Sequence, residues 1–191
     1  MKKVFIIGYN RIATKAIHEL FKRSGYLSAH YSLADIETGG SIIIAEQMKQ
    51  NLKDFKPLLH RMDHLQVFSD MFWHREDTWI DGIKYYHEIY CDYPDAYFIM
   101  NTRNMDEWLE SKRNHKKGAY IKRCMEYHGM DTEEDMQAWF FQDRIDHENE
   151  VRRYFTNNER FLEFDVDTEI DKLIEFVKPD FFLKKSHWVR V

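Results

Sequence analysis

The chain opens with an uninterrupted apolar run, Val4 to Ile7, which ends at Gly8. A run without alternation of polar and apolar residues is typical of a parallel strand buried on both faces. Ile17, Leu20 and Phe21 then recur at helical spacing. The order predicts a strand, a tight loop in which Gly8 lets the chain turn sharply, and a helix. This unit restricts the fold more than any other feature of the sequence.

Strands and helices are expected to alternate along the rest of the chain. The expected strands are residues 26–32, 66–69, 96–102 and 160–164, and the expected helices are 41–53, 79–91, one capped by Asn104 with Glu107, one capped by Thr132, and 170–177. This alternation predicts an α/β fold of three layers, with helices on both faces of a mostly parallel central sheet. No stretch has the composition of a linker, so residues 1–191 are expected to form one domain.

Composition and charge exclude several other classes of protein. With 43% hydrophobic residues the chain can bury a core, and its net charge of −5 argues against a general nucleic-acid role. No apolar run reaches membrane-spanning length, and no signal peptide is recognisable. The two cysteines, Cys91 and Cys124, form no C-x-x-C pair, so a reducing cytoplasm is the default location.

Three polar or flexible positions each follow a predicted strand: Gly8, Asp70 and Arg103. Ligands of open parallel sheets bind outside the carboxyl ends of the strands. After Gly8, Arg11 offers positive charge, and Thr14 and Lys15 lie at the start of a helix, beside its positive dipole end.

A second anion site is expected at Arg103 and at Ser111, eight residues later. Two such sites predict a nucleotide that is anionic at both ends. The structural alternatives are an ordinary turn with a surface arginine for the first loop, and pairing of Arg103 with Asp106 or Glu107 for the second site.

The first loop is not an ATP-binding P-loop. Counted from Gly8, the pattern G-x-x-x-x-G-K-[ST] requires glycine where Ala13 stands and lysine where Thr14 stands. The loop resembles instead the sulfotransferase pattern G-x-x-[RK]-[TS]-G-T-[TK]-[SA]-[LI]. The matching residues are Gly8, Arg11, Thr14, Lys15, Ala16 and Ile17. Ile12 and Ala13 depart from this pattern.

The spacing of Arg103 and Ser111 is the second feature of this resemblance. Other family-like segments follow in the right order: Phe68–Asp70, Tyr93–Ala96, Trp108, His147–Asn149, Val151–Phe155 and Phe161–Asp165. The chain is most similar to the small, divergent branch found in microbes and some eukaryotes. The resemblance implies the P-loop-nucleoside-kinase-like fold of sulfotransferases. The late basic residues Lys184, Lys185 and Arg190 match the family poorly and are expected to form an exposed tail.

The resemblance also implies a donor substrate, 3'-phosphoadenosine 5'-phosphosulfate. The residues expected to hold its 5' phosphosulfate are Gly8, Arg11, Ala13, Thr14, Lys15 and Ala16. Arg103 and Ser111 are expected to hold its 3' phosphate. Arg11 is the expected stabiliser of charge on the leaving oxygen. A sulfuryl group carries less charge than a phosphoryl group, so no metal is expected.

A base should take the proton of the acceptor, which is expected to be a small molecule or glycan carrying a hydroxyl or amine. Asp70 is the first candidate base and His74 the second, with a cap or salt bridge and an exposed loop histidine as their structural alternatives. A group of aromatic residues is expected to belong mostly to the core, although it could line an acceptor pocket. Its members are Trp73, Trp79, Tyr85, Tyr86 and Tyr90.

Two other functions fit parts of the sequence. In a nucleotide or small-molecule kinase, Asp70 would serve magnesium, but the misplaced lysine counts against this reading. In a non-catalytic nucleotide-binding relative, Ala13 would mark a degenerate loop. The sequence defines neither the acceptor nor the oligomeric state.

Overall fold

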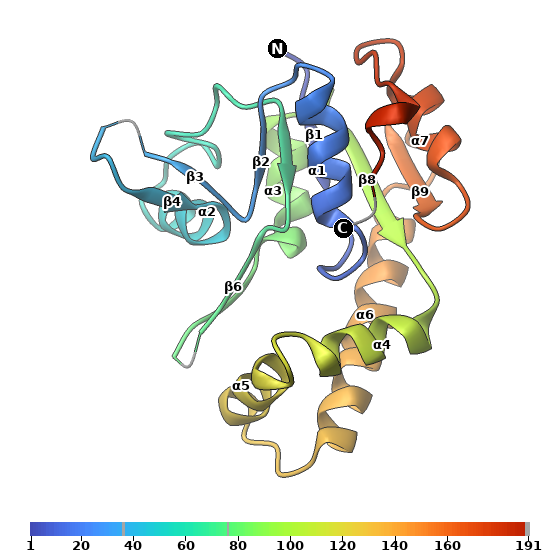
Figure 1. Ribbon diagram of the computed structural model, residues 1–191. Coiled ribbons are helices and arrows are strands. Elements are labelled where there is room, and N and C mark those ends of the chain that lie inside the picture. The colour runs from blue at the N-terminus through green and yellow to red at the C-terminus, as the bar shows by residue number, and fades with distance from the viewer. Residues whose placement is uncertain (36, 76, 190–191) are drawn as a thin grey trace. The chain divides into compact units, whose positions relative to one another are not determined.

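The computed structural model describes residues 1–35, 37–75 and 77–189, which form an α/β protein (Figure 1). Within these residues the main sheet has seven strands in the order β4-β3-β2-β5-β1-β8-β9. Their bounds are β1 Val4–Ile6, β2 Ser28–His30, β3 Ser32–Ala34, β4 Ser41–Ile43, β5 Val67–Ser69, β8 Tyr97–Thr102 and β9 Phe161–Asp165. A separate two-stranded sheet pairs β6, Phe72–His74, with β7, Trp79–Asp81.

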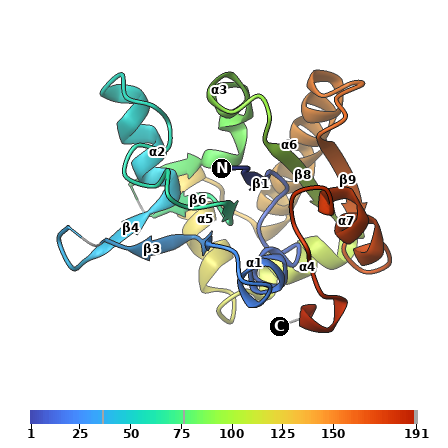
Figure 2. The same cartoon turned by 90° about the horizontal axis from the view of Figure 1, so that it is seen from above.

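The five adjacent strands from β2 to β9 are parallel, which confirms the predicted fold class. Helix α1, Thr14–Arg23, lies on one face of the sheet, and α3, Tyr86–Asp92, lies on the other (Figures 1 and 2). Helix α7, Ile170–Val177, contacts β9. The carboxyl ends of β2, β5, β1 and β8 therefore lie along one edge of the sheet, as the sequence predicts for a ligand site.

Phe5 anchors the middle of the core. It pairs in register with Phe68 on β5 and with Phe98 on β8. Its ring stacks on both neighbours, with centroid separations of 5.2 and 5.8 Å, and all three side chains are fully buried. Stacked aromatic rings fix the alignment of these three central strands. This alignment determines where the carboxyl ends of the strands lie.

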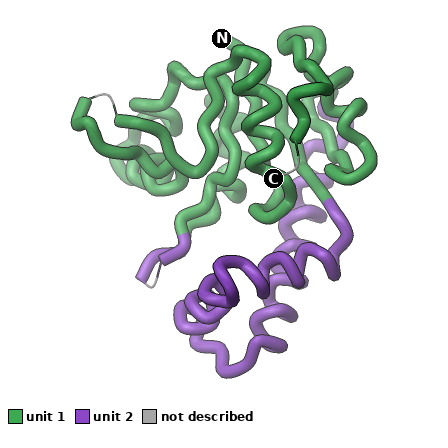
Figure 3. The backbone as a smooth tube through the Cα atoms, viewed as in Figure 1, with its two compact units in different colours: residues 1–73, 80–102, 159–191 green, residues 74–79, 103–158 purple. Residues whose placement is uncertain are grey.

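The chain divides into two compact units (Figure 3). Unit 1 contains the main sheet and comprises residues 1–73, 80–102 and 159–191, apart from those not described. Unit 2 comprises residues 74–79 and 103–158 and contains α4 Met105–Asn114, α5 Ala119–His128 and α6 Glu133–Tyr154. A single domain over residues 1–191 stays a prediction.

Several expected elements have the predicted ends. The side chain of Asn104 accepts a hydrogen bond from the Glu107 amide at 3.1 Å, and Thr132 caps α6 through the Asp135 amide at 3.1 Å. Both caps confirm the sequence interpretation, because each satisfies an amide that the first helical turn leaves unpaired.

The helix expected over residues 41–53 begins later. Ser41–Ile43 form β4, which pairs antiparallel with β3, so α2 covers only Ile44–Lys53. This prediction was wrong at its start because residues 41–43 pair with the preceding strand, and the helical pattern by itself does not show this pairing.

The helix expected over residues 79–91 is also corrected. Trp79–Asp81 form β7, a 3-10 turn follows at Gly82–Tyr85, and α3 begins only at Tyr86. Aromatic side chains suit a strand as well as a buried helix, and pairing with β6 decides between the two. Helix α5 was not predicted at all.

No helix among the described residues is long and apolar enough to span a bilayer. Lys184 and Lys185 are exposed, as expected of a basic tail, and η2 covers Lys185–His187. Arg190, the third basic residue of that tail, lies outside the described residues.

Candidate functional site

The loop from Gly8 to Ala13 joins β1 to α1 in unit 1. Among the described residues the glycines with positive φ are Gly25, Gly39, Gly118 and Gly129, so a left-handed turn is not the reason for Gly8. A Cβ atom at Gly8 would lie 2.5 Å from the carbonyl oxygen of Asn101 and 2.8 Å from its amide nitrogen. Gly8 is required because the loop starts directly against the backbone of β8.

The left-handed backbone of this loop falls on Arg11 and Ala13. Their φ angles are 66° and 53°, and Ala13 is the residue that precedes α1. Ala13 stands at the glycine of the sulfotransferase loop pattern, and it retains the conformation that favours glycine. Successive amides in a turn of this kind form an anion-binding concavity, which here adjoins the positive end of a ten-residue helix.

Asn101 fixes this loop from the neighbouring strand. The side chain is fully buried on β8, and its Nδ2 donates to the carbonyl oxygen of Ile12 at 2.5 Å. Sequence reasoning missed this residue. Its only signal was an amide at the end of a strand whose preceding four residues are apolar or aromatic.

Thr14 begins α1 and is 5% exposed, whereas Arg11 and Lys15 are exposed. The hydroxyl of Thr14 lies 3.3 Å from Nε2 of His30, at the end of β2. The same nitrogen lies 3.6 Å from Oδ2 of Asp70, directly after β5. The structure thus brings two predicted residues, Thr14 and Asp70, to a histidine that the sequence analysis did not select.

His18 and His30 occupy this region in their neutral forms. Burial, followed by the charge of Lys15, lowers the pKa of His30 to about 4. Burial, followed by the nearby His30, lowers the pKa of His18 to about 4. Nδ1 of His18 is hydrogen-bonded to the hydroxyl of Ser28 at 2.8 Å, and the two imidazole rings lie 5.8 Å apart. At neutral pH both rings can therefore accept a proton.

Arg103 and Ser111 belong to unit 2. Arg103 follows β8 and donates from Nη2 to Oε2 of Glu107 at 2.6 Å, which is one of the two pairings that the sequence left open. The Arg103 carbonyl oxygen accepts a hydrogen bond from buried Arg144 at 2.8 Å, and Arg144 is held by Glu148 at 2.6 Å. Ser111 is half-buried on α4, two turns after Arg103.

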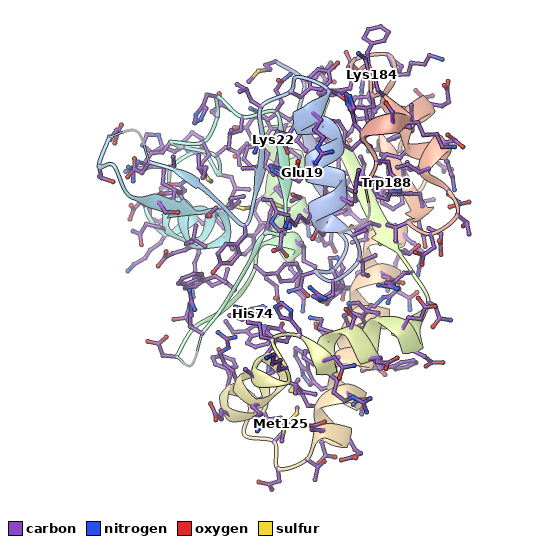
Figure 4. The ribbon with its side chains drawn as sticks, viewed as in Figure 1. Glu19, Lys22, His74, Met125, Lys184 and Trp188 are labelled. Carbon is purple, nitrogen blue, oxygen red and sulfur yellow. The ribbon has the colours of Figure 1, made fainter. Side chains whose placement is uncertain are left out.

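His74, the second candidate base, also belongs to unit 2 and is labelled in Figure 4. Its Nδ1 lies 2.9 Å from the hydroxyl of Tyr120, and its ring stacks on Trp79 at 3.5 Å. The Tyr120 hydroxyl also accepts from Lys112 at 3.4 Å. His74 is therefore part of a hydrogen-bonded aromatic cluster within unit 2.

The fold, the loop geometry and the sequence patterns agree with a comparison to known families. Residues 3–127, about two thirds of the chain, match the family described as the sulfotransferase domain. The chain belongs to the sulfotransferase family. No curated protein matches the sequence significantly.

Family membership makes this protein a transferase whose general chemistry is sulfuryl transfer. The matched residues include the loop after β1, Asp70, and the Arg103–Ser111 segment, whereas α6, β9 and α7 lie beyond them. Within the part of the chain that the structure describes, no group of three histidine, cysteine or acidic residues is arranged to hold a metal ion.

Proposed function

We propose that this sulfotransferase moves a sulfuryl group from 3'-phosphoadenosine 5'-phosphosulfate to a hydroxyl or amine of a small-molecule or glycan acceptor. The observation that carries the proposal is the loop after β1. Ala13 keeps the left-handed backbone at the family's glycine position, and Asn101 holds the loop at Ile12. The departure at Ala13 therefore does not by itself make the loop degenerate.

In this proposal the first loop binds the 5' phosphosulfate. The amides from Gly8 to Ala16 and the hydroxyl of Thr14 act as hydrogen-bond donors, and Arg11 and Lys15 supply positive charge. Both charged side chains are exposed, Arg11 in the loop and Lys15 in the first turn of α1, so they can reach an incoming anion. The same segment includes the predicted contacts at Ala13 and Ala16.

Arg103 and Ser111 bind the 3' phosphate as a separate anion site. Arg103 offers a guanidinium that forms an ion pair with the carboxylate of Glu107, with side chains 20% and 58% exposed. A partly exposed ion pair contributes about 1 kcal/mol or less, so a doubly charged phosphate can compete with it for the guanidinium. Ser111 adds a hydroxyl from the same helix that Asn104 caps.

The transfer proceeds in line. The acceptor oxygen or nitrogen attacks sulfur while the bridging oxygen leaves with the nucleotide phosphate. Arg11 stabilises the charge that develops on this leaving oxygen. Of the two predicted bases, Asp70 lies beside Thr14 and His30, whereas His74 is hydrogen-bonded within unit 2, so proton transfer is assigned to the group of residues around Asp70.

Nucleotide binding and transfer test the proposal in two stages. We expect 3'-phosphoadenosine 5'-phosphate to raise the melting temperature of the protein without magnesium. We also expect the protein to transfer radioactive sulfate from the labelled donor to at least one of four test acceptors: a phenol, a sugar, an aliphatic alcohol and an amine. Stabilisation by ATP with magnesium alone would show a kinase. Nucleotide binding without transfer to any acceptor would show a binding protein.

Turnover is expected to persist in excess chelator, because cationic side chains neutralise the low charge of the sulfuryl group. The transfer assay is repeated with EDTA, then with added magnesium. Loss of turnover in EDTA and its recovery with magnesium would contradict the proposed role of Arg11 and Lys15.

Arg11→Ala is expected to lower kcat by about 10²-fold, with a much smaller change in the dissociation constant of the donor. The arginine gains interaction as the leaving oxygen becomes charged, so its loss affects the chemical step most. Lys22→Ala, on the helix α1 that follows the loop (Figure 4), is the control for loss of a positive charge and should retain turnover. Normal turnover of Arg11→Ala would reduce the loop to a structural turn.

A further inference from the structure

Two side chains of unit 1, from distant parts of the sequence, approach one histidine nitrogen. Nε2 of His30 lies 3.3 Å from the hydroxyl of Thr14 and 3.6 Å from Oδ2 of Asp70. The sheet brings them together, because His30 on β2 pairs in register with Ser69 on β5, and Asp70 is the next residue. The nitrogen therefore lies between a proposed donor-binding group and a carboxylate.

The backbone has left-handed φ angles directly after His30 and at Asp70. Tyr31, which follows His30, has a φ of 65°, and Asp70 has a φ of 54°. A bulky residue such as tyrosine rarely adopts this region, whereas aspartate tolerates it, and such conformations concentrate at functional sites. The Tyr31 amide donates to the carbonyl oxygen of Ser69 at 3.0 Å, which holds the two strand ends together.

The charged and titratable groups around His30 come from two directions. Lys15, His18 and Glu19 lie on α1, and Asp70 follows β5. Burial and Lys15 lower the pKa of His30 to about 4, and Glu19 opposes them. The imidazole is therefore neutral at neutral pH, with one ring nitrogen able to accept a proton.

We infer that His30 accepts the proton of the sulfuryl acceptor, and that Asp70 positions His30 and balances its charge; this inference rests on the proposed function. The acceptor oxygen forms a bond to sulfur as the bond between sulfur and the bridging oxygen breaks. The electron pair of the broken bond leaves with the 5' phosphate of the nucleotide, and the acceptor proton moves to Nε2 of His30. The resulting imidazolium faces the Asp70 carboxylate, which favours the protonated product.

The same arrangement couples proton uptake to donor binding. An anion bound at Lys15 offsets the positive charge that lowers the pKa of His30. Donor binding therefore makes His30 more basic when a base is needed. Thr14 contributes to this coupling, because the hydroxyl beside Nε2 is also the proposed ligand of the phosphosulfate.

Kinetics of His30→Gln give the first test, with His18→Gln as the matched control. Both histidines are in the same region, but only His30 lies beside Thr14 and Asp70. His30→Gln should lower kcat by about 10²-fold or more while the KM for the donor changes less than about threefold. The fall in rate at acid pH should disappear from the pH–rate profile of His30→Gln. The control His18→Gln should keep the wild-type kcat and the wild-type fall in rate at acid pH. Asp70→Asn should lower kcat and shift the pH of that fall, as expected of a positioning residue.

Imidazole titration by NMR gives a second readout that does not require an acceptor. The pKa of His30 in the full-length wild-type protein should rise when 3'-phosphoadenosine 5'-phosphate binds, and Lys15→Ala should reduce this rise. A pKa of His30 that does not change in the nucleotide-bound protein overturns the inference, as does wild-type kcat in His30→Gln. Melting-temperature shifts with the same nucleotide verify that His30→Gln is folded and binds it.

Different results would contradict the proposed sulfotransferase function and the proposed role of His30. A wild-type protein that neither binds the nucleotide nor transfers sulfate removes the proposed function and this inference together. A wild-type protein that transfers sulfate, with His30→Gln equally active, removes only the role of His30.

Discussion

Ala13 replaces the glycine of the family pattern, but its backbone has the left-handed conformation that glycine favours. Alanine in the left-handed region costs about 1 kcal/mol relative to a residue that enters it freely. Ala13→Gly should therefore raise the free energy of unfolding by about 1 kcal/mol or less, since glycine also loses more entropy on folding. Sulfate transfer should change little, because the loop already has the required conformation.

Urea denaturation measures this change. Ala16→Gly is the control, because Ala16 lies within α1 and glycine there should lower stability by about 1 kcal/mol. Equal destabilisation by both substitutions would contradict the assigned role of the left-handed backbone. A large gain in turnover of Ala13→Gly would show instead that alanine had impaired the loop.

Arg103 and Glu107 give opposite expectations at the second anion site. Arg103→Ala should weaken binding of 3'-phosphorylated nucleotides by roughly 1.5–3 kcal/mol, through loss of a charge-assisted hydrogen bond. Glu107→Gln removes the carboxylate that now holds Arg103 at 2.6 Å and should tighten the same binding by up to about fivefold.

Calorimetry with 3'-phosphoadenosine 5'-phosphate and with adenosine 5'-phosphate distinguishes loss of the 3' phosphate contact from a general loss of nucleotide affinity. Only the first nucleotide carries a 3' phosphate, so only its affinity should respond strongly. Equal responses for the two nucleotides would remove Arg103 from the 3' phosphate site.

At the scale of elements, β8 determines the path of the loop that leaves β1. Gly8→Ala should lower the free energy of unfolding by about 1–3 kcal/mol, because the new methyl group overlaps β8. Two of the atoms that it meets belong to the Asn101 backbone, at 2.5 and 2.8 Å. Adding Asn101→Ala should therefore not restore stability.

Urea denaturation of both single variants and of the double variant tests this expectation. Asn101→Ala alone should cost about 1–3 kcal/mol, because the carbonyl oxygen of Ile12 loses its buried donor. Recovery of Gly8→Ala by Asn101→Ala would mean that only the side chain, and not the strand backbone, restricts Gly8.

At the scale of the whole molecule, the two neutral histidines make stability depend on pH. The pKa values of His18 and His30 are about 4 in the folded chain and 6.5 without burial. The unfolded chain therefore binds more protons between these values, and the free energy of unfolding falls as pH drops from 6.5 towards 4. The loss amounts to at most ~3 kcal/mol per histidine.

Urea denaturation at several pH values from 4 to 7 measures this slope. The double variant His18→Gln, His30→Gln should show a markedly flatter dependence over that range. An unchanged slope would mean that other groups carry the proton uptake on unfolding.

Much of the fold was predictable because its signals are local. The apolar run before Gly8, the caps at Asn104 and Thr132, and the alternation of strands with helices depend on residues close in the chain. The same local patterns placed Gly8, Asp70 and Arg103 after strands, and the structure has them there. Where local patterns fit two structures, as at Trp79–Asp81, the sequence interpretation was wrong.

The amino-acid sequence by itself determined the class of fold and the loop that resembles the family pattern. Tertiary structure alone decided which residues meet at that loop. His30 lies beside Asp70 because β2 pairs with β5, and Asn101 reaches Ile12 across a separation of 89 residues. Such contacts depend on the pairing of distant strands, which follows from burial of the whole core and leaves no periodic signal in either segment.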